Sequence, residues 1–126
     1  MAPMFPIQTE GAHTAEFILS EASGNRSRDN AQFADPTTLK VGQPVQKVSG
    51  ATTDTPAIYS PATTGATCHA LAIYAGASSS GSPLRIAILA RDAEVNARLI
   101  NWGALSPAEQ VIGAQTLEGK GIICRL

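Results

Sequence analysis

The chain has 126 residues, a length that fits one domain with its own apolar core. Nine basic and ten acidic residues are scattered along it and give a formal net charge of −1, so no basic block exists to neutralise a row of phosphates. We therefore expect no nucleic-acid partner. No apolar run reaches the roughly 18 residues that a membrane span needs, so we also expect no membrane partner. Because the first basic residue is Arg26, we expect no secretory signal, and synthesis in the cytoplasm would keep Cys68 and Cys124 reduced.

The first 15 residues contain neither Lys nor Arg. Pro3 and Pro6 interrupt isolated apolar residues, a pattern too broken for a helix. We predict that residues 1–15 form an extended arm and residues 16–126 the folded domain. A terminus without a role is the plain alternative, but spaced apolar side chains are typical of a segment that adds to a partner's groove or sheet edge. The candidate contact residues are Met4, Phe5, Ile7, Thr9, Phe17 and Leu19.

Residues 16–30 join the arm to the domain. The apolar run 17–19 predicts a short strand, and the Ser, Gly and Asn residues at 23–25 predict a turn. Charged residues cluster around this turn without a nucleophile or a set of metal ligands beside them. A structural network of ion pairs and hydrogen bonds therefore explains them better than an acid and base pair. The predicted anchor residues are Glu21, Arg26, Arg28, Asp29 and Asn30.

The next segment alternates apolar and polar residues. Over residues 39–48 the alternation is interrupted by Gly42 and Pro44, which predicts an edge strand with a bend or bulge. Residues 49–65 are rich in Thr, Ser, Ala, Gly and Pro, which predicts an exposed loop or a long hairpin. A loop of that length would offer an interaction surface, unless it is an excursion without a role.

Residues 66–75 predict a strand bounded by glycines. Period-two geometry places Cys68 on the face shared with the alanines at 70 and 72, and His69 on the other face. This arrangement argues against a Cys and His dyad, and two cysteines with two histidines match no zinc spacing. We expect no metal and no cofactor, with Cys68 acting as a small buried apolar residue.

Two helices are predicted in the last third, after a nearly continuous apolar run at 84–90 that predicts a strand covered on both faces. Asp92 as a cap and Glu94 in the first turn predict a helix that extends to Trp102. Catalytic carboxylates are the alternative for both acidic residues, but capping explains them without further assumption. Trp102 would be a core residue or a buried anchor of an interface.

The second helix has the clearer start. Ser106 is the expected cap, Pro107 the first helical residue and Glu109 the partner in a capping box. The helix should extend to about residue 118, stop at Gly119, and bury Val111, Ile112 and Leu117.

A short terminal strand should follow this helix. It would bury Ile122 and Cys124 or, in the other register, Ile123. Together the elements predict a mainly β domain with two short helices, of the α+β class.

Several short motifs in a fixed order resemble the lambda-type head decoration protein family of tailed bacteriophages. The resemblance covers about residues 16–125, except that the long segment 49–65 departs from the family pattern. The matching pieces are residues 17–22 with Gly24, residues 27–30, Leu39 with Gly42, residues 91–96, and residues 121–123 with Arg125.

The resemblance implies a β-clip domain without catalytic activity that assembles as a homotrimer. Such trimers sit on the outer surface of the expanded icosahedral head at local three-fold positions and cement neighbouring major capsid subunits. It also implies an N-terminal arm that becomes ordered on the capsid, which agrees with the independent prediction for residues 1–15. The protein would be made in the host cytoplasm and end on the virion surface.

Two other classes stay open at this point. A small β-barrel ligand-binding or carrier module would share the strand content, although the sequence shows no lysine in a tight hairpin and no aromatic cage. An enzyme is the third class, but no nucleophile elbow, phosphate loop or metal motif organises the Ser, His and Asp residues.

Overall fold

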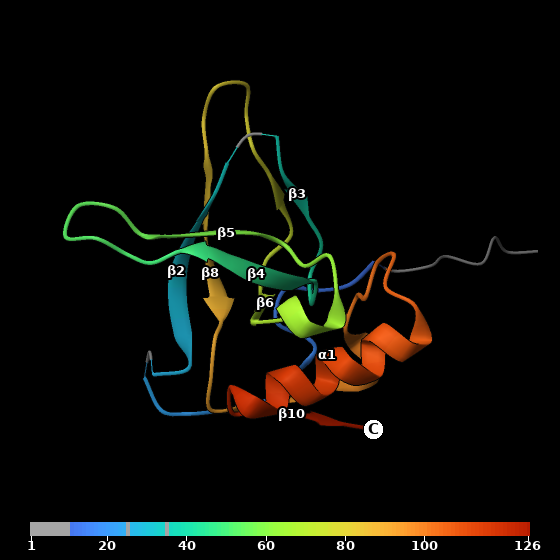
Figure 1. Cartoon of the computed structure of the whole chain (residues 1–126). Helices are drawn as coiled ribbons and strands as arrows, with labels where there is room; N and C mark the ends of the chain where they lie inside the picture. The colour runs from blue at the N-terminus through green and yellow to red at the C-terminus, as the bar shows by residue number, and fades with distance from the viewer. Residues whose placement is uncertain (1–10, 25, 35) are drawn as a thin grey trace, which may run out of the picture.

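The computed structural model describes residues 11–24, 26–34 and 36–126, and shows a closed barrel with a helix and a small sheet packed at one end (Figure 1). The predicted mainly β fold is confirmed. The barrel strands, in spatial order, are β2 (Arg28–Phe33), β5 (Ala57–Pro61), β4 (Pro44–Ser49), β6 (Ala70–Ala72) and β8 (Leu84–Leu89). The small sheet has β9 (Ala93–Asn96) between β1 (Ile18–Glu21) and β10 (Ile122–Arg125). The other elements are β3 (Thr38–Leu39), which pairs with β7 (Gly76–Ala77), the 3₁₀ helices η1 (Gly65–Thr67) and η2 (Ala97–Leu99), and α1 (Pro107–Gly119).

Strand pairing joins segments that are distant in the sequence. In the barrel, β2 runs antiparallel to β8, from Arg28 opposite Leu89 to Phe33 opposite Leu84, and parallel to β5. In the small sheet, β9 pairs antiparallel with β1 and parallel with β10. This sheet therefore joins the start of the described chain to its last third.

Two apolar clusters share the strands of the barrel. The barrel core contains Ala31, Phe33, Leu39, Val45, Ala57, Tyr59, Ala70, Ala72 and Ile88. The helix-side core contains Phe17, Val41, Cys68, Leu71, Ile73, Leu89, Ala93, Val95, Ile100, Leu117 and Ile122. Successive residues of a strand point to opposite faces, so β6 and the end of β8 contribute to both clusters. The predicted double coverage of β8 is therefore found at Ile88 and Leu89, while residues 84–87 are only partly buried or exposed.

Helix α1 begins at the predicted cap and proline, but the predicted capping box is wrong, because the Glu109 carboxylate accepts from the Gly65 backbone N–H and not from that of Ser106. Ser106 Oγ accepts a hydrogen bond from the backbone N–H of Glu109 at 3.3 Å, and Pro107 is the first helical residue. The C-terminal end of α1 differs from the prediction. The helix includes Gly119, and the left-handed residue that follows it is Gly121, with φ of 84°. A glycine tolerates this conformation, which positions the chain to enter β10.

The predicted buried side of α1 was only partly right. Leu117 is fully buried, but Val111 and Ile112 are 60% and 42% exposed. The inner face instead uses Gly113, where an added Cβ would lie 2.8 Å from Trp102 Cζ3. The helix also packs on η1, where an added Cβ at Gly65 would clash with the Glu109 carbonyl oxygen. Because α1 packs against the domain through Gly113, the larger side chains of Val111 and Ile112 remain on its exposed face.

The predicted helix at 92–102 is wrong. Asp92 has φ of 52°, which is unlike the extended conformation of a helix cap. The next residues form β9, in which Ala93 and Val95 are buried while Glu94 and Asn96 are more exposed. This alternation has the period of a strand, and hydrogen bonding to β1 and β10 stabilises it. Only η2 is helical in this region, and Trp102 packs half-buried against the helix-side core.

The structure of residues 39–48 and 49–65 agrees only in part with the prediction. Gly42, with φ of 77°, makes the predicted bend between β3 and β4. However, β4 lies between β5 and β6 and is not an edge strand, although its register shifts between Lys47 and Ser49. The hairpin alternative for 49–65 is confirmed, since β4 and β5 are antiparallel neighbours joined by an exposed loop that projects from the barrel (Figure 1).

The predicted strand 66–75 is shorter than expected. Residues 65–67 form η1, so Cys68 does not share a face with Ala70 and lies in the helix-side core instead. The terminal strand adopts the first of the two predicted registers, with Ile122 buried, Cys124 partly buried and Ile123 exposed. No helix in the described part of the chain has the length and apolar character needed to span a membrane.

Candidate functional site

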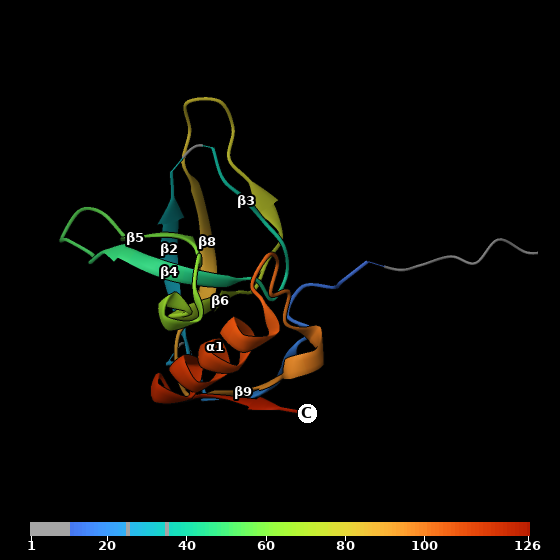
Figure 2. The ribbon, with the colours of Figure 1, turned by 45° about the vertical axis from the view of Figure 1, so that its right-hand side comes forward.

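The chain enters the domain through a turn at residues 13–17, which we call the arm root. Ala15 has φ of 61°, and its backbone N–H donates to the Ile73 carbonyl at 3.2 Å. His13 N–H donates to Glu16 Oε2 at 3.1 Å, and Glu16 N–H donates back to the His13 carbonyl. The next residue, Phe17, is fully buried in the helix-side core. These contacts fix the direction in which the exposed residues 11–14 leave the domain (Figure 2).

The predicted contact residues have different positions. Met4, Phe5, Ile7 and Thr9 lie outside the described residues. Phe17 has no exposed surface, so its side chain holds the arm root and does not face a partner. Leu19 is 55% exposed on β1, which is an edge strand of the small sheet. Leu19 is therefore the described member of the set that a partner could contact.

The polar corner, which we define as residues 20–30, is organised by Glu21. Its carboxylate accepts hydrogen bonds from Arg28 Nη2 at 2.7 Å, Arg28 Nε at 3.0 Å and Ser27 Oγ at 2.6 Å. Ser27 is fully buried, and the Glu21 and Arg28 side chains are mostly buried. The Arg28 guanidinium and then the Ser27 hydroxyl lower the pKa of Glu21, while Glu21 raises the pKa of Arg28. This network ties the end of β1 to the start of β2.

The second ion pair of the corner includes Arg91, which was part of a family motif but was not among the predicted anchor residues. Asp29 pairs with Arg91, which also donates from Nη1 to the Arg26 carbonyl at 2.8 Å. The Arg26 side chain lies 3.9 Å from Asp92, but both are well exposed, so this pair contributes little. The register of β2 against β8 brings Asp29 and Arg91 together, and only the fold supplies that register.

Asn30 differs from the other predicted anchors. It is exposed and pairs with Ala87 in the ladder between β2 and β8. No hydrogen bond of its side chain is found among the described residues. The corner also lies at the far end of β1 from the arm root, so it joins β1 and β2 and does not hold the arm itself (Figure 1).

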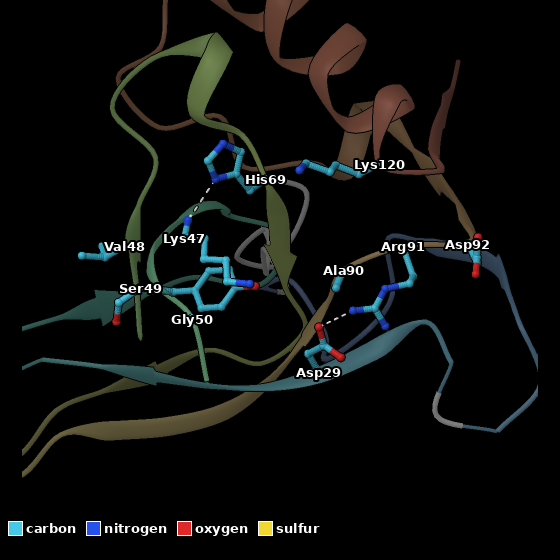
Figure 3. Close-up of a pocket in the computed structure, with 11 residues that line it drawn as sticks. Asp29, Lys47, Val48, Ser49, Gly50, His69, Ala90, Arg91, Asp92 and Lys120 are labelled. Atoms are coloured by element: carbon cyan, nitrogen blue, oxygen red, sulfur yellow. Dashed lines mark hydrogen bonds and ion pairs between the residues drawn. The ribbon is translucent and has the colours of Figure 1, made fainter. Parts of the chain in front are cut away.

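A polar surface pocket of about 610 Å³ lies beside the corner. Its walls come from β2, the end of β4, β5, the segment before β6, the connection between β8 and β9, and the C-terminal end of α1 (Figure 3). His69 Nδ1 accepts a hydrogen bond from the Lys47 backbone N–H at 3.0 Å. Burial, then the positive charges of Lys120 and Lys47, lower the pKa of His69. The imidazole is therefore neutral at pH 7.

Cys68 and His69 lie in different environments in the described part of the chain. No three His, Cys, Asp or Glu side chains gather as metal ligands within residues 11–24, 26–34 and 36–126. Cys68 lies in the helix-side core, where burial raises its pKa to about 11, so the thiol stays protonated at neutral pH. Its Sγ donates to the Thr64 carbonyl at 3.5 Å, while His69 lines the pocket.

These features define a class of small β-barrel scaffold that holds an N-terminal segment at a fixed root and displays a charged pocket. The comparison with protein families identifies the class further. The family model for bacteriophage lambda head decoration protein D matches residues 7–119. The chain therefore belongs to this family, which confirms the resemblance seen in the sequence. No curated protein and no solved structure matched the chain. Proteins of the family are structural components of the phage head and not enzymes.

Proposed function

We propose that this protein binds the outer surface of an expanded icosahedral phage head and cements neighbouring major capsid subunits. It does so as a homotrimer at local three-fold positions, with each barrel being of the β-clip type. Membership of the head decoration family carries the proposal, because the match covers most of the chain and includes the segment that leads into the arm root. The protein would be located on the virion surface.

The arm, residues 1–15, is the proposed main contact with the capsid. Fully extended, 15 residues span about 50 Å, which is enough to reach across a subunit boundary. The arm would add to a sheet edge of the capsid protein, where its backbone satisfies hydrogen bonds and alternate side chains enter pockets. The proposed contact residues are Met4, Phe5, Ile7, Thr9 and Leu19.

The arm root supports this role physically. Phe17 is buried, and Ala15 bonds to the backbone of the domain, so the last residues of the arm start from a fixed place. A fixed starting point lowers the entropy lost when the arm binds. A trimer would present three such arms, and linked weak sites raise avidity by roughly 10² to 10⁴ when all engage.

The test is to delete residues 1–12 and leave the arm root intact. We expect the shortened protein to form trimers and melt as the full chain does, but to lose binding to purified expanded heads. Co-sedimentation with heads measures binding, and analytical ultracentrifugation measures assembly. A matched control replaces residues 1–12 by a Gly and Ser segment of equal length, which should behave like the deletion. Undiminished binding by either variant would contradict the proposed role of the arm.

The structure of the barrel does not support the alternative function as a ligand-binding or carrier module. Such modules hold small ligands in an internal cavity. Here the interior is filled by the barrel core, in which Phe33 and Tyr59 lie with ring centroids 6.3 Å apart. The charged pocket is on the outside of the barrel, where a macromolecular partner could reach it.

A further inference from the structure

The pocket beside the corner contains charges of two kinds. Arg91 already binds Asp29, so that pair is neutral within the pocket. By contrast, Lys47 and Lys120 have no carboxylate within ion-pair distance in the part of the chain that the structure describes. Asp92 is the remaining acidic residue of the lining, so the pocket has a surplus of one positive charge.

The two lysines line the same pocket from different elements. Lys47 belongs to β4, and Lys120 caps the C-terminal end of α1. Figure 3 shows the Lys120 side chain extending toward His69, which lies between β4 and the helix end. Both ammonium groups are close enough to lower the pKa of His69, after the larger effect of burial.

His69 adds a neutral donor beside the two lysines. Its Nδ1 accepts from the Lys47 backbone, so in the neutral ring the proton is on Nε2. No acceptor for Nε2 is found among the described residues. Two ammonium groups and an N–H donor therefore line one pocket, and a carboxylate can accept hydrogen bonds from each of them.

We propose that this pocket binds an acidic side chain, Asp or Glu, of the major capsid protein. The inference rests on the proposed function, because it takes the capsid subunit as the partner. It adds a second contact to the arm, one made by the folded domain. One carboxylate would neutralise the surplus charge of the pocket.

The rim of the pocket favours a protein segment as the occupant. Val48 is 61% exposed at the rim, next to Ser49 and Gly50, which lead into the projecting loop between β4 and β5. An apolar side chain beside a charged pocket is typical of protein interfaces, where apolar and polar contacts are mixed. The volume of about 610 Å³ also exceeds what one carboxylate needs and leaves room for its neighbours in a chain.

The experiment compares Lys47→Gln, Lys120→Gln and the double variant with the matched controls Lys40→Gln and Arg98→Gln. The control residues are exposed and lie outside the pocket lining. Binding of each full-length protein to purified expanded heads is measured at two salt concentrations. We expect each pocket variant to bind about 2- to 5-fold more weakly and the double variant about 10-fold, with a shallower salt dependence. The controls and all melting temperatures should match the original protein.

A zero-length carbodiimide crosslink identifies the source of the carboxylate. The reagent joins a lysine Nζ to a carboxyl carbon as an amide with loss of water, so only groups in contact react. We expect mass spectrometry to find Lys47 or Lys120 joined to an acidic residue of the capsid protein. A link to another copy of this chain, or loss of the trimer in the double variant, would assign the pocket to self-assembly and overturn the proposal.

The two proposals fail in different ways. If the original protein does not bind heads, the proposed function is wrong and the pocket assignment is wrong with it. If the original protein binds and the double variant binds equally well at both salt concentrations, only the pocket assignment is wrong.

Discussion

The two ends of β1 are held in the fold by different forces. At the N-terminal end, the arm root depends on the fully buried ring of Phe17. At the C-terminal end, the polar corner depends on Glu21, which accepts hydrogen bonds from Arg28 and Ser27. Burial of an apolar ring depends little on pH or salt, whereas a carboxylate network depends on its ionisation. The arm is thus rooted at the end that changing solution conditions disturb least.

The largest effect is expected at the apolar end. Replacement of Phe17 by Ala leaves a cavity in the helix-side core and should lower the free energy of unfolding by about 3–5 kcal/mol, measured by denaturant titration. The matched control is Leu19→Ala, two residues away and exposed, which should cost less than about 1 kcal/mol. Similar losses in the two variants would show that the arm root is not held by burial.

A smaller effect is expected at the polar end. Glu21→Gln removes the charge that Arg28 binds and weakens the acceptor for the buried Ser27 hydroxyl. We expect a loss of about 1–3 kcal/mol at pH 7. Arg26→Ala is the matched control at the same corner, with an expected change within about 0.5 kcal/mol, because its side chain is exposed.

The same substitution should change how stability depends on pH. The folded pKa of Glu21 is lowered, so its contribution is complete above the pKa of the unfolded chain, about 4.3, and is lost as pH falls through the folded pKa. The difference in unfolding free energy between the original protein and Glu21→Gln should therefore shrink in acid. Glu94, whose pKa Arg125 also lowers, is present in both proteins and cancels in this difference. A difference that stays constant from pH 7 to pH 2 would contradict the assignment.

The smallest effect is expected at Ala15. Its φ of 61° disfavours any residue with a Cβ, so Ala15→Gly should raise the free energy of unfolding by roughly 0.5 kcal/mol after the entropy of glycine is counted. Ala12→Gly is the control in the exposed arm and should leave stability unchanged. A loss of stability in Ala15→Gly larger than that of the control would show that the turn at the arm root is not strained.

Local signals in the sequence predicted local structure well. The start of α1 was predictable because Ser106 and Pro107 act within one helical turn. The terminal strand was predictable from a short apolar run after a glycine, but the sequence left its register open between two alternatives. The resemblance to the family was also found from short motifs, and it is confirmed by the family comparison.

Features that depend on distant segments were not predictable in the same way. Residues 93–96 become a strand because β1 and β10 supply hydrogen-bond partners, and no local pattern reports those partners. The pairing of Arg91 with Asp29 depends on the register of β2 against β8. Phe17 was placed on the surface because an apolar residue next to an arm can equally be a contact or a root, and only the packing of the core decides. The charged pocket collects residues from six separate segments, so its existence required the fold.

The reactivity of the two free thiols, Cys68 and Cys124, can report which part of the domain unfolds. Burial raises the pKa of both Cys68 and Cys124, so thiol reagents react slowly while the fold is closed. Cys124 is partly buried on the edge strand β10, and Cys68 is fully buried under α1. Alkylation should therefore mark Cys124 when the terminal strand detaches and Cys68 only when the helix lifts from the barrel. The order in which the two thiols are alkylated would then report the order of local unfolding. The same measurement can be made on the free protein and on the protein bound to phage heads.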